Sequence, residues 1–374
     1  MKFIVSSTSL FSHLQAISRV INAKSTLPIL DSFLLNLEGN LLTITASDLE
    51  TTLITSMEVE NNAGNGTIAI SAKILLDTLR EFSEQPLTFE INDENLAMVV
   101  KSGTGQYNFI GQNGEEYPRM LQLGAEATSL TVNVATLLTG ISKTIFATAD
   151  DELRPVMNGI YFDITTDNLT LVATDAHKLV RYQTTATKGS SAAAFILPKK
   201  PAMLLKNILP KETGDVSIRF DDKNAYFTLS NYQMICRLVE GRFPNYNGVI
   251  PKNNPHKLII DRLEFMNTLK RVSLFSNQAS NLIKLQINGT ELNVSAQDID
   301  FSVSAEEKVA CQYEGEPMSI GFKSTFLIDI LNNINSTEVI VELADPSRAG
   351  LILPFENEEN ENVLMLLMPM LLND

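Results

Sequence analysis

The stretch Leu169-Thr170-Leu171-Val172-Ala173-Thr174-Asp175 decides the fold, because the chain contains three versions of it. The other two are Leu42-Thr43-Ile44-Thr45-Ala46-Ser47-Asp48 and Leu292-Asn293-Val294-Ser295-Ala296-Gln297-Asp298, and the terminal aspartates are 127 and 123 residues apart. Apolar residues alternate along each copy, which is typical of a half-buried strand, and the Asp predicts a turn at its end. A repeat at a nearly constant period indicates a chain built from copies of one structural unit.

Two further landmarks follow the same period. A strand that runs through a basic residue into a helix lies 25 residues after each Asp, at Lys73, Lys200 and Lys323. A proline stands near the end of each copy, at Pro118, Pro244 and Pro369. Each copy also opens with a strand that leads into a helix, at residues 2–23, 129–148 and 257–277. Three landmarks in one order make the repeat a strong signal.

The repeated unit predicts an α+β fold. It contains one strand, a helix, several strands, a second helix and several more strands, with turn signals such as Glu38-Gly39-Asn40 between the strands. Antiparallel sheets with two helices per unit packed on one face are expected. The boundaries divide the chain into domains 1–125, 126–251 and 252–374, and Pro251-Lys252-Asn253-Asn254-Pro255 is typical of a linker.

Composition places the chain among globular proteins. It has 374 residues, of which 44% are hydrophobic, so each copy can bury a core. Its two cysteines, Cys236 and Cys311, have no zinc-ligand spacing, and no metal or cofactor site is expected. We found no signal peptide and no apolar run of membrane-spanning length, and therefore expect a soluble, cytoplasmic protein without membrane contact.

Charge is unevenly distributed. The formal net charge is −15, which by itself does not suggest nucleic-acid binding. The six expected helical segments, however, sum to about +7, which leaves about −22 for the remainder. If the six helices share one face, that face is basic and suits sequence-independent contact with phosphates. The alternative is an ordinary solvated surface on each helix.

Two rival functions stay open at this point. An enzyme could use Asp48, Asp175 and Asp298, but their places at strand ends favour local capping of the backbone. The chain lacks the Gly-rich phosphate-binding motifs and the nucleophile-elbow motif, and His13, His177 and His256 have no ligand spacing. A three-domain protein scaffold without a DNA role is the second rival, and the helix charges argue against it.

The sequence resembles one known family along its whole length, the bacterial DNA polymerase III beta subunit or sliding clamp. The segments that carry the resemblance are Met1-Lys2-Phe3, Thr26-Leu27-Pro28-Ile29-Leu30, Ser47-Asp48-Leu49-Glu50, Ala173-Thr174-Asp175-Ala176-His177-Lys178-Leu179, Glu240-Gly241-Arg242-Phe243-Pro244-Asn245-Tyr246, Ile320-Gly321-Phe322 and Met368-Pro369-Met370. Their order and their coincidence with the repeat make the resemblance specific.

The resemblance implies a non-catalytic processivity factor. Two chains would join head to tail into a six-domain ring, with the helices lining the hole and the sheets outside, and the ring would encircle double-stranded DNA without reading its sequence. The dimer, rather than a trimer, is implied by the resemblance alone. The basic residues that match DNA-contacting positions of the family are Lys24, Lys73, Arg80, Lys199, Lys200 and Lys206.

The resemblance also implies a pocket for partner proteins between the second and third domains. It would take a short linear motif from the polymerase III alpha subunit, the ATP-driven clamp loader, other polymerases and repair proteins. The matching residues are Arg154, Met157, Thr174, His177, Leu179, Pro244, Val249, Met368, Pro369 and Met370. Methionine suits a surface with several partners, although a C-terminal core strand is the alternative for this Met-rich segment. Pro155, Val156, Ala176, Lys178 and Leu371 depart from the family pattern, which bears on the peptide preference.

Two apolar residues on the fifth helix predict an interface. Phe265, Leu269 and Val272 form its core stripe, and Leu274 and Phe275 fall outside that stripe. The alternative is that the helix ends early and both side chains turn inward. By resemblance they match the subunit contact, which faces Tyr107 and Phe109 of the partner's first domain.

Overall fold

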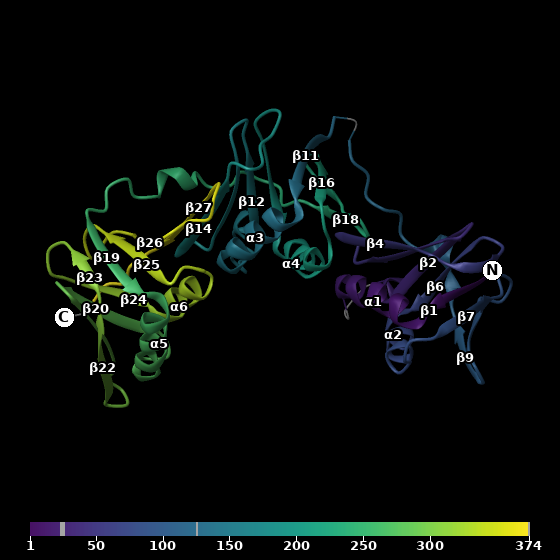
Figure 1. Cartoon of the computed structure of the whole chain (residues 1–374), viewed down its shortest axis with the longest axis horizontal. Coiled ribbons are helices and arrows are strands. Elements are labelled where there is room, and N and C mark those ends of the chain that lie inside the picture. The colour runs from purple at the N-terminus through teal and green to yellow at the C-terminus, as the bar shows by residue number, and fades with distance from the viewer. Residues whose placement is uncertain (23–26, 125, 373–374) are drawn as a thin grey trace. The chain divides into compact units, whose positions relative to one another are not determined.

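The computed structural model describes residues 1–22, 27–124 and 126–372, and Lys24 therefore lies outside the described residues. Six α-helices occur among them, two in each expected domain, and Figure 1 labels them along the chain. They are α1 (Ser7–Ile17), α2 (Ala72–Arg80), α3 (Val134–Thr144), α4 (Lys199–Ile208), α5 (Arg262–Val272) and α6 (Ser324–Asn332). The α+β class and the threefold arrangement predicted from the sequence are confirmed.

Four antiparallel sheets accompany the helices. In sheet order, the first contains β5 (Glu60–Ala63), β1 (Lys2–Ser6), β7 (Pro86–Ile91), β8 (Ala97–Ser102) and β9 (Gly105–Ile110). The second contains β10 (Gln112–Asn113), β6 (Gly66–Ser71), β2 (Ser32–Glu38), β3 (Leu41–Ser47), β4 (Thr51–Glu58), β18 (Tyr232–Arg237), β17 (Asn224–Thr228), β16 (Asp215–Phe220) and β11 (Thr128–Asn133).

The remaining two sheets lie toward the C-terminus. The third contains β15 (Ala193–Pro198), β12 (Gly159–Ile164), β13 (Leu169–Thr174), β14 (Lys178–Thr184), β27 (Glu361–Leu367), β26 (Gly350–Pro354), β25 (Glu338–Leu343), β19 (His256–Asp261) and β23 (Gln312–Glu314). The fourth contains β22 (Val303–Ala310), β21 (Glu291–Asp298), β20 (Leu282–Asn288) and β24 (Met318–Lys323).

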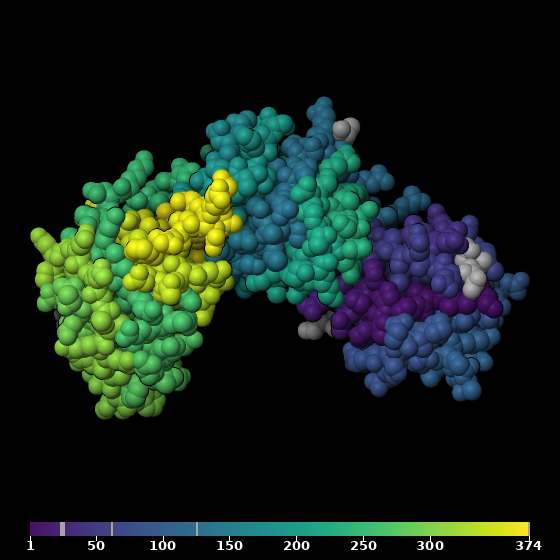
Figure 2. Space-filling view, in the orientation of Figure 1, coloured from purple at the N-terminus to yellow at the C-terminus, as the bar shows by residue number. Residues whose placement is uncertain are grey.

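Both nine-stranded sheets cross a domain boundary. The second sheet joins first-domain β4 to second-domain β18, and the third joins second-domain β14 to third-domain β27. Figure 2 shows the C-terminal segment, in yellow, packed against part of the second domain, in teal. As a consequence the chain forms two compact units, residues 1–135 with 203–238 and residues 136–202 with 239–374, so the second domain contributes to both.

The apolar faces predicted for the helices are buried. On α2, Leu75 and Leu79 are at most 2% exposed, and on α5 the predicted stripe Phe265, Leu269 and Val272 is at most 1% exposed. A side chain repeated every three or four residues stays on one face of a helix, so the core side of each helix follows from local spacing alone.

The aspartates that end the repeated strand cap hairpin turns, as predicted. Oδ1 of Asp48 accepts hydrogen bonds from the amides of Glu50 and Thr51, at 3.1 and 2.7 Å. Asp175 and Asp298 accept the corresponding pairs of amides. Each carboxylate thus satisfies backbone donors that the tight turn leaves without partners.

The third copy departs from the repeat by two residues. In the first two copies the capping Asp lies three residues before the start of the next strand, whereas Asp298 pairs with Val303 across a longer turn. The strand pairings therefore align Lys323 with Ser71 and Pro198 rather than with Lys73 and Lys200. Lys323 ends β24, while Lys73 and Lys200 lie inside helices, so equal sequence spacing did not mean equal position here.

The joint between the first and second domains includes a partly buried histidine. The Thr55 hydroxyl donates to the carbonyl of Asn231 at 3.0 Å, so it accepts a hydrogen bond from Nδ1 of His13 at 2.6 Å. The imidazole also lies 5.7 Å from the Tyr232 ring. Burial lowers the pKa of His13; Glu212 raises it and Lys211 lowers it further, each by a smaller amount.

We expect this joint to weaken in mild acid. Because the folded-state pKa of His13 lies below its unfolded value of about 6.5, the unfolded chain binds the proton first, and stability is lost as the pH falls below that value. Thermal unfolding midpoints at pH 7.5 and 5.5 measure the loss in the wild type and in His13→Gln, which cannot titrate. An equal drop in both proteins would show that His13 is not responsible.

Candidate functional site

The centre of the candidate site is the turn between β13 and β14. The Thr174 hydroxyl donates to the carbonyl of Lys178 at 2.8 Å and accepts from the amide of Ala176 at 3.2 Å. Ala176 has φ of +75°, a left-handed conformation in which glycine has no steric cost. The turn leaves the His177 side chain exposed.

The C-terminal segment is tied to this turn. The amide of Met368 donates to the carbonyl of His177 at 2.9 Å, and two residues on, the amide of Met370 donates to the carbonyl of Gly321 at 2.8 Å. A Cβ at Gly321 would come within 2.7 Å of the Met370 carbonyl oxygen, so only glycine allows this approach. The methionine segment therefore runs from the second-domain turn to β24 of the third domain.

A closed loop carries Arg154 and Met157. The Asn158 side chain donates to the carbonyl of Asp151 at 2.9 Å and accepts from its amide at 3.0 Å, which pins the loop across its base. The Arg154 guanidinium donates to the Asp151 carboxylate at 2.8 Å, and this hydrogen bond is the largest cause of the lowered pKa of Asp151. Both side chains are partly exposed to solvent, so the pair adds little to stability.

An apolar cluster supports these segments from below. Its buried members are Val172, Leu179, Ile196, Phe243, Tyr246, Ala349, Leu351, Leu364 and Leu366. Tyr161 stacks on Phe243 at 4.7 Å, and the Tyr246 hydroxyl donates to Asp163 at 2.7 Å. Burial and the Asp163 carboxylate raise the pKa of Tyr246. The connector that carries Pro244 and Val249 is thereby anchored to the sheet.

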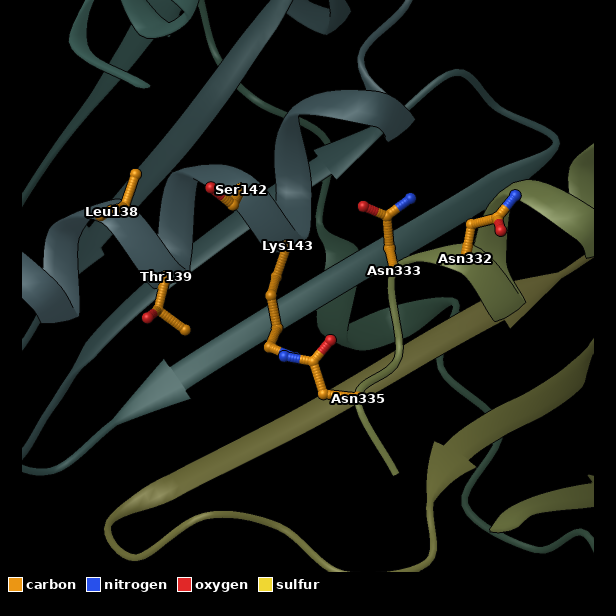
Figure 3. A pocket seen from close by; sticks show the side chains of 7 residues that line it. All are labelled: Leu138, Thr139, Ser142, Lys143, Asn332, Asn333 and Asn335. Carbon is orange, nitrogen blue, oxygen red and sulfur yellow. The ribbon is translucent and has the colours of Figure 1, made fainter. Parts of the chain in front are cut away.

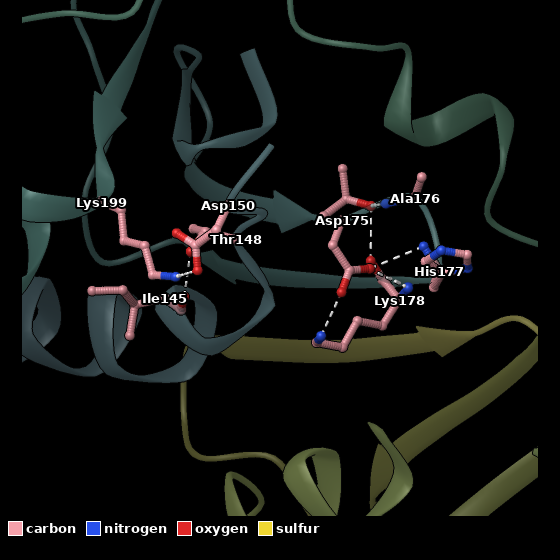
Figure 4. A network of polar contacts seen from close by, with 9 residues as sticks. Ile145, Thr148, Asp150, Asp175, Ala176, His177, Lys178 and Lys199 are labelled. Carbon is pink, nitrogen blue, oxygen red and sulfur yellow. Dashed lines mark hydrogen bonds and ion pairs between the residues drawn. The ribbon is translucent and has the colours of Figure 1, made fainter. Parts of the chain in front are cut away.

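A buried cation, which was not predicted from the sequence, lies beside this turn. The Lys178 side chain is 6% exposed, and its Nζ lies 2.5 Å from Oδ2 of Asp175 and 4.1 Å from the centre of the Phe326 ring on α6 (Figure 4 shows the Asp175 contacts). Nζ of Lys323 lies 4.7 Å from the same ring, and His177 stacks against it at 5.9 Å. Phe326 thus links α6 to the turn, a contact that no spacing in the sequence indicates.

These contacts bring four segments together in one surface, which we call the joint surface. The segments are the loop of Arg154 and Met157, the turn of Thr174 to Leu179, the connector with Pro244 and Val249, and the methionine segment Met368 to Met370. Thr174 and Leu179 are buried beneath it, whereas Val249 and Met368 are 59% and 43% exposed. Met365 is fully buried in β27, so the core-strand alternative holds for that methionine and not for Met368. Exposed apolar side chains over a rigid base suit the binding of an extended apolar peptide.

The described DNA-contact candidates lie on or beside helices. Lys73 and Arg80 are exposed on α2, and Lys200 and Lys206 are exposed on α4. Lys199 begins α4 and pairs with Asp150 at 2.6 Å, as Figure 4 shows. Arg80 pairs with Asp77 at 3.3 Å. Their placement at helix surfaces agrees with the basic helical face expected from the sequence, whose common orientation stays a prediction.

The interface candidates differ in exposure. Helix α5 does end early, at Val272, but Leu274 and Phe275 stay 81% and 40% exposed rather than turning inward. Tyr107 is 39% exposed and packs edge-on against Phe82, while Phe109 is only 9% exposed. Two further apolar residues, Ile299 and Phe301, were not predicted from the sequence; they are 79% and 76% exposed in the long turn before β22.

A polar cavity of about 200 Å³ lies between α3 and the end of α6. Its lining residues are Leu138, Thr139, Ser142, Lys143, Asn332, Asn333 and Asn335, and Figure 3 shows Lys143 extending toward Asn335. Burial lowers the pKa of Lys143, and Glu361 and Glu358 partly oppose this.

Three copies of a two-helix domain, with antiparallel sheets that run on from one domain to the next, define the class of DNA clamps. Three family models match the chain: the DNA polymerase III beta subunit N-terminal domain at residues 1–121, the central domain at 131–245 and the C-terminal domain at 247–371. The chain belongs to the DNA polymerase III beta subunit family. It is a DNA sliding clamp of the replicative polymerase, a non-catalytic processivity factor.

Individual relatives are similar to this chain along its full length. The beta sliding clamp of Haemophilus influenzae is 31% identical over 99% of this chain and 100% of its own. A solved sliding clamp from Bartonella birtlesii, bound to griselimycin, has a TM-score of 0.92 at 31% identity, and one from Pseudomonas aeruginosa has 0.94 at 26%; both cover each chain completely. No helix in the described part of the chain is long and apolar enough to cross a membrane.

The buried pair at the joint surface yields a stability prediction. Lys178→Met leaves the Asp175 carboxylate without its cation, and we expect a loss of about 3 kcal/mol, the lower end for buried pairs, because Asp175 keeps two amide donors. Chemical denaturation measures the loss. The double variant Lys178→Met with Asp175→Asn removes the unpaired charge and should recover part of it. A double variant as unstable as the sum of both single variants would contradict this coupling.

Proposed function

We propose that two copies of this chain close head to tail into a ring around duplex DNA. The observation that carries the proposal is a pair of open sheet edges. Two joints are bridged inside the chain, by β4 with β18 and by β14 with β27, and each gives a nine-stranded sheet. The five-stranded sheet ends at β9 and the four-stranded sheet ends at β22, and together they would make a third sheet of the same size.

The internal repeat supplies the register of this third joint. Thr51 pairs with Cys236 at the first joint, and Lys178 pairs with Leu367 at the second. When the copies of the repeat are matched by their strand pairings, Val303 is equivalent to Thr51 and Lys178. In the same way, Phe109 is equivalent to Cys236 and Leu367. Antiparallel pairing in the same register sets Val303 opposite Phe109 and Ser304 opposite Asn108 of a second chain. A contact that repeats the internal one closes when its rotation permits, and closure removes both exposed edges.

Apolar side chains support the same contact. Leu274 and Phe275, which follow α5, are exposed beside β22, together with Ile299 and Phe301. On the opposite edge, Tyr107 and Ile110 are exposed along β9. Burial of such residues on both sides of a new strand pair would add hydrophobic stabilisation to the main-chain hydrogen bonds.

Within the ring, the DNA contacts would be made by Lys24, Lys73, Arg80, Lys199, Lys200 and Lys206. Lysine and arginine attract phosphates irrespective of base sequence, and weak, exchangeable contacts permit sliding. The domain boundaries near residues 125 and 251 belong to the same proposal. They separate the copies along the chain, although the compact units divide the second domain between them.

The joint surface would bind a short linear motif of partner proteins. Its exposed members, among them His177, Pro244, Val249 and Met368, stand over a fixed apolar base, and the flexible thioether of methionine adapts to different side chains. The polymerase III alpha subunit, the clamp loader and repair proteins are the partners implied by the family. Competition between them for one surface would let the clamp serve each in turn.

Cysteine cross-linking tests the head-to-tail contact. A chain with Asn108→Cys and Ser304→Cys should form covalent dimers on mild oxidation or with a short bismaleimide, because the proposed register sets these exposed residues opposite each other. The products are separated by denaturing electrophoresis. The native Cys236 and Cys311 are buried, which limits background reaction.

Two matched variants complete this test. Leu274→Asp with Phe275→Asp places charges in the contact and should yield monomers that no longer cross-link, as measured by sedimentation. Leu153→Asp, which changes an exposed leucine on the loop that carries Arg154 and Met157, should leave the dimer intact. Dimers that survive the first change, or efficient cross-linking when Ser304→Cys is replaced by Lys308→Cys, would disprove the proposed contact.

Encirclement predicts retention that depends on the shape of the DNA. A clamp loaded by its loader onto a nicked circular plasmid should stay bound through gel filtration, whereas on the linearised plasmid it should slide off the ends. Blocking both linear ends with bound protein should restore retention. Equal retention on circular and open linear DNA would mean that the protein holds DNA by local contacts, and absence of retention on both would favour a scaffold.

A further inference from the structure

Two of the cations proposed to contact DNA already have a carboxylate partner. The Arg80 guanidinium lies 3.3 Å from Oδ1 of Asp77, one turn earlier on α2, and Nζ of Lys199 lies 2.6 Å from Oδ2 of Asp150. We infer that Asp77 and Asp150 lower the affinity for DNA, because Asp77 competes with phosphate for Arg80 and Asp150 competes with phosphate for Lys199. This inference rests on the proposed function, which supplies the DNA-facing role of Arg80 and Lys199.

The geometry allows exchange between carboxylate and phosphate. Asp150 is 80% exposed and Lys199 is 32% exposed, so the pair lies at the surface (Figure 4). Lys199 is also held by its backbone, because its amide donates to the carbonyl of Asn158 at 3.0 Å. Its ammonium group can therefore turn from Asp150 to a phosphate while the start of α4 stays in place. Asp77 and Arg80 are both more than half exposed.

The size of the effect follows from the strength of such pairs. An exposed ion pair is weak, so removing the carboxylate should raise the affinity for duplex DNA by about 1.5- to 5-fold for each pair. A cation that no longer exchanges partners also contributes fully to counterion release, which steepens the salt dependence by up to about 0.9 per phosphate contact. A protein that must slide along DNA benefits when its contacts with phosphates are weak enough to exchange.

The test measures binding of the full-length dimer to a short fluorescent duplex at several KCl concentrations. We expect Asp150→Asn and Asp77→Asn each to bind more tightly at low salt and to show a steeper dependence on salt concentration. Asp167→Asn removes the same charge at an exposed turn between β12 and β13 and controls for net charge. Affinity for a partner peptide should be unchanged in all three variants, which would confirm that the loop carrying Arg154 and Met157 is intact.

Double variants decide between a local and a general effect. In the Lys199→Ala background, Asp150→Asn should change affinity no more than Asp167→Asn does, and the same holds for Asp77→Asn in the Arg80→Ala background. An equal gain with and without the cation, or a gain no larger than that of Asp167→Asn, overturns the inference while leaving the clamp function standing. Wild-type protein without salt-dependent binding to the duplex would instead refute the proposed DNA contacts.

Discussion

A main-chain ladder that crosses from one domain to the next is the interaction on which the rest of this protein depends. At the joint of β14 and β27, seven consecutive residue pairs align between strands nearly two hundred positions apart in sequence. A central strand must satisfy its amide and carbonyl groups on both sides, so each joint holds two domains as one sheet. The capped turns, the apolar cluster and the methionine segment are all positioned relative to that ladder.

The same backbone carries different chemistry at its two internal joints. At the second joint the amide of Met368 bonds the carbonyl of His177, and at the first the amide of Arg237 bonds the carbonyl of Glu50 in the equivalent place, at 2.8 Å. There the side chains form an ion pair, with Arg237 and Glu50 3.4 Å apart. Buried Leu179 is likewise replaced by Thr52, whose hydroxyl bonds Ser47. The two joints therefore share one backbone arrangement, and at these two positions the first joint has an ion pair and a buried threonine where the second has Met368 and Leu179.

The ion pairs of the chain differ in how far they are exposed to solvent. The chain is acidic as a whole, whereas its helical segments together carry a net positive charge, and two of their cations, Arg80 and Lys199, pair with carboxylates at the surface. Such pairs contribute little to stability, but they alter what a neighbouring phosphate encounters. The buried pair of Lys178 and Asp175 differs, because both charges are withdrawn from water and the Phe326 ring covers the cation.

Features that depend on local spacing were predictable from the sequence. The threefold period, the Asp-capped turns and the core faces of α2 and α5 follow from alternation or from helical periodicity within a few residues. Leu274 and Phe275 were singled out because they lie outside the core stripe of the fifth helix. The pocket residues, Tyr107 and Phe109 were named through family resemblance, because exposed side chains such as Met368 leave no periodic signal that separates them from core or solvated surface.

The sequence by itself determined that one α+β unit occurs three times and which side of α2 and α5 is apolar, since helical and strand periodicity is read from residues a few positions apart. Only the tertiary structure decided which strands of different domains pair, that Lys178 is buried against Phe326, and that Lys323 is displaced from Lys73 and Lys200 by a longer turn. These outcomes depend on contacts between distant segments, where main-chain pairing and close packing select one partner among many of similar composition.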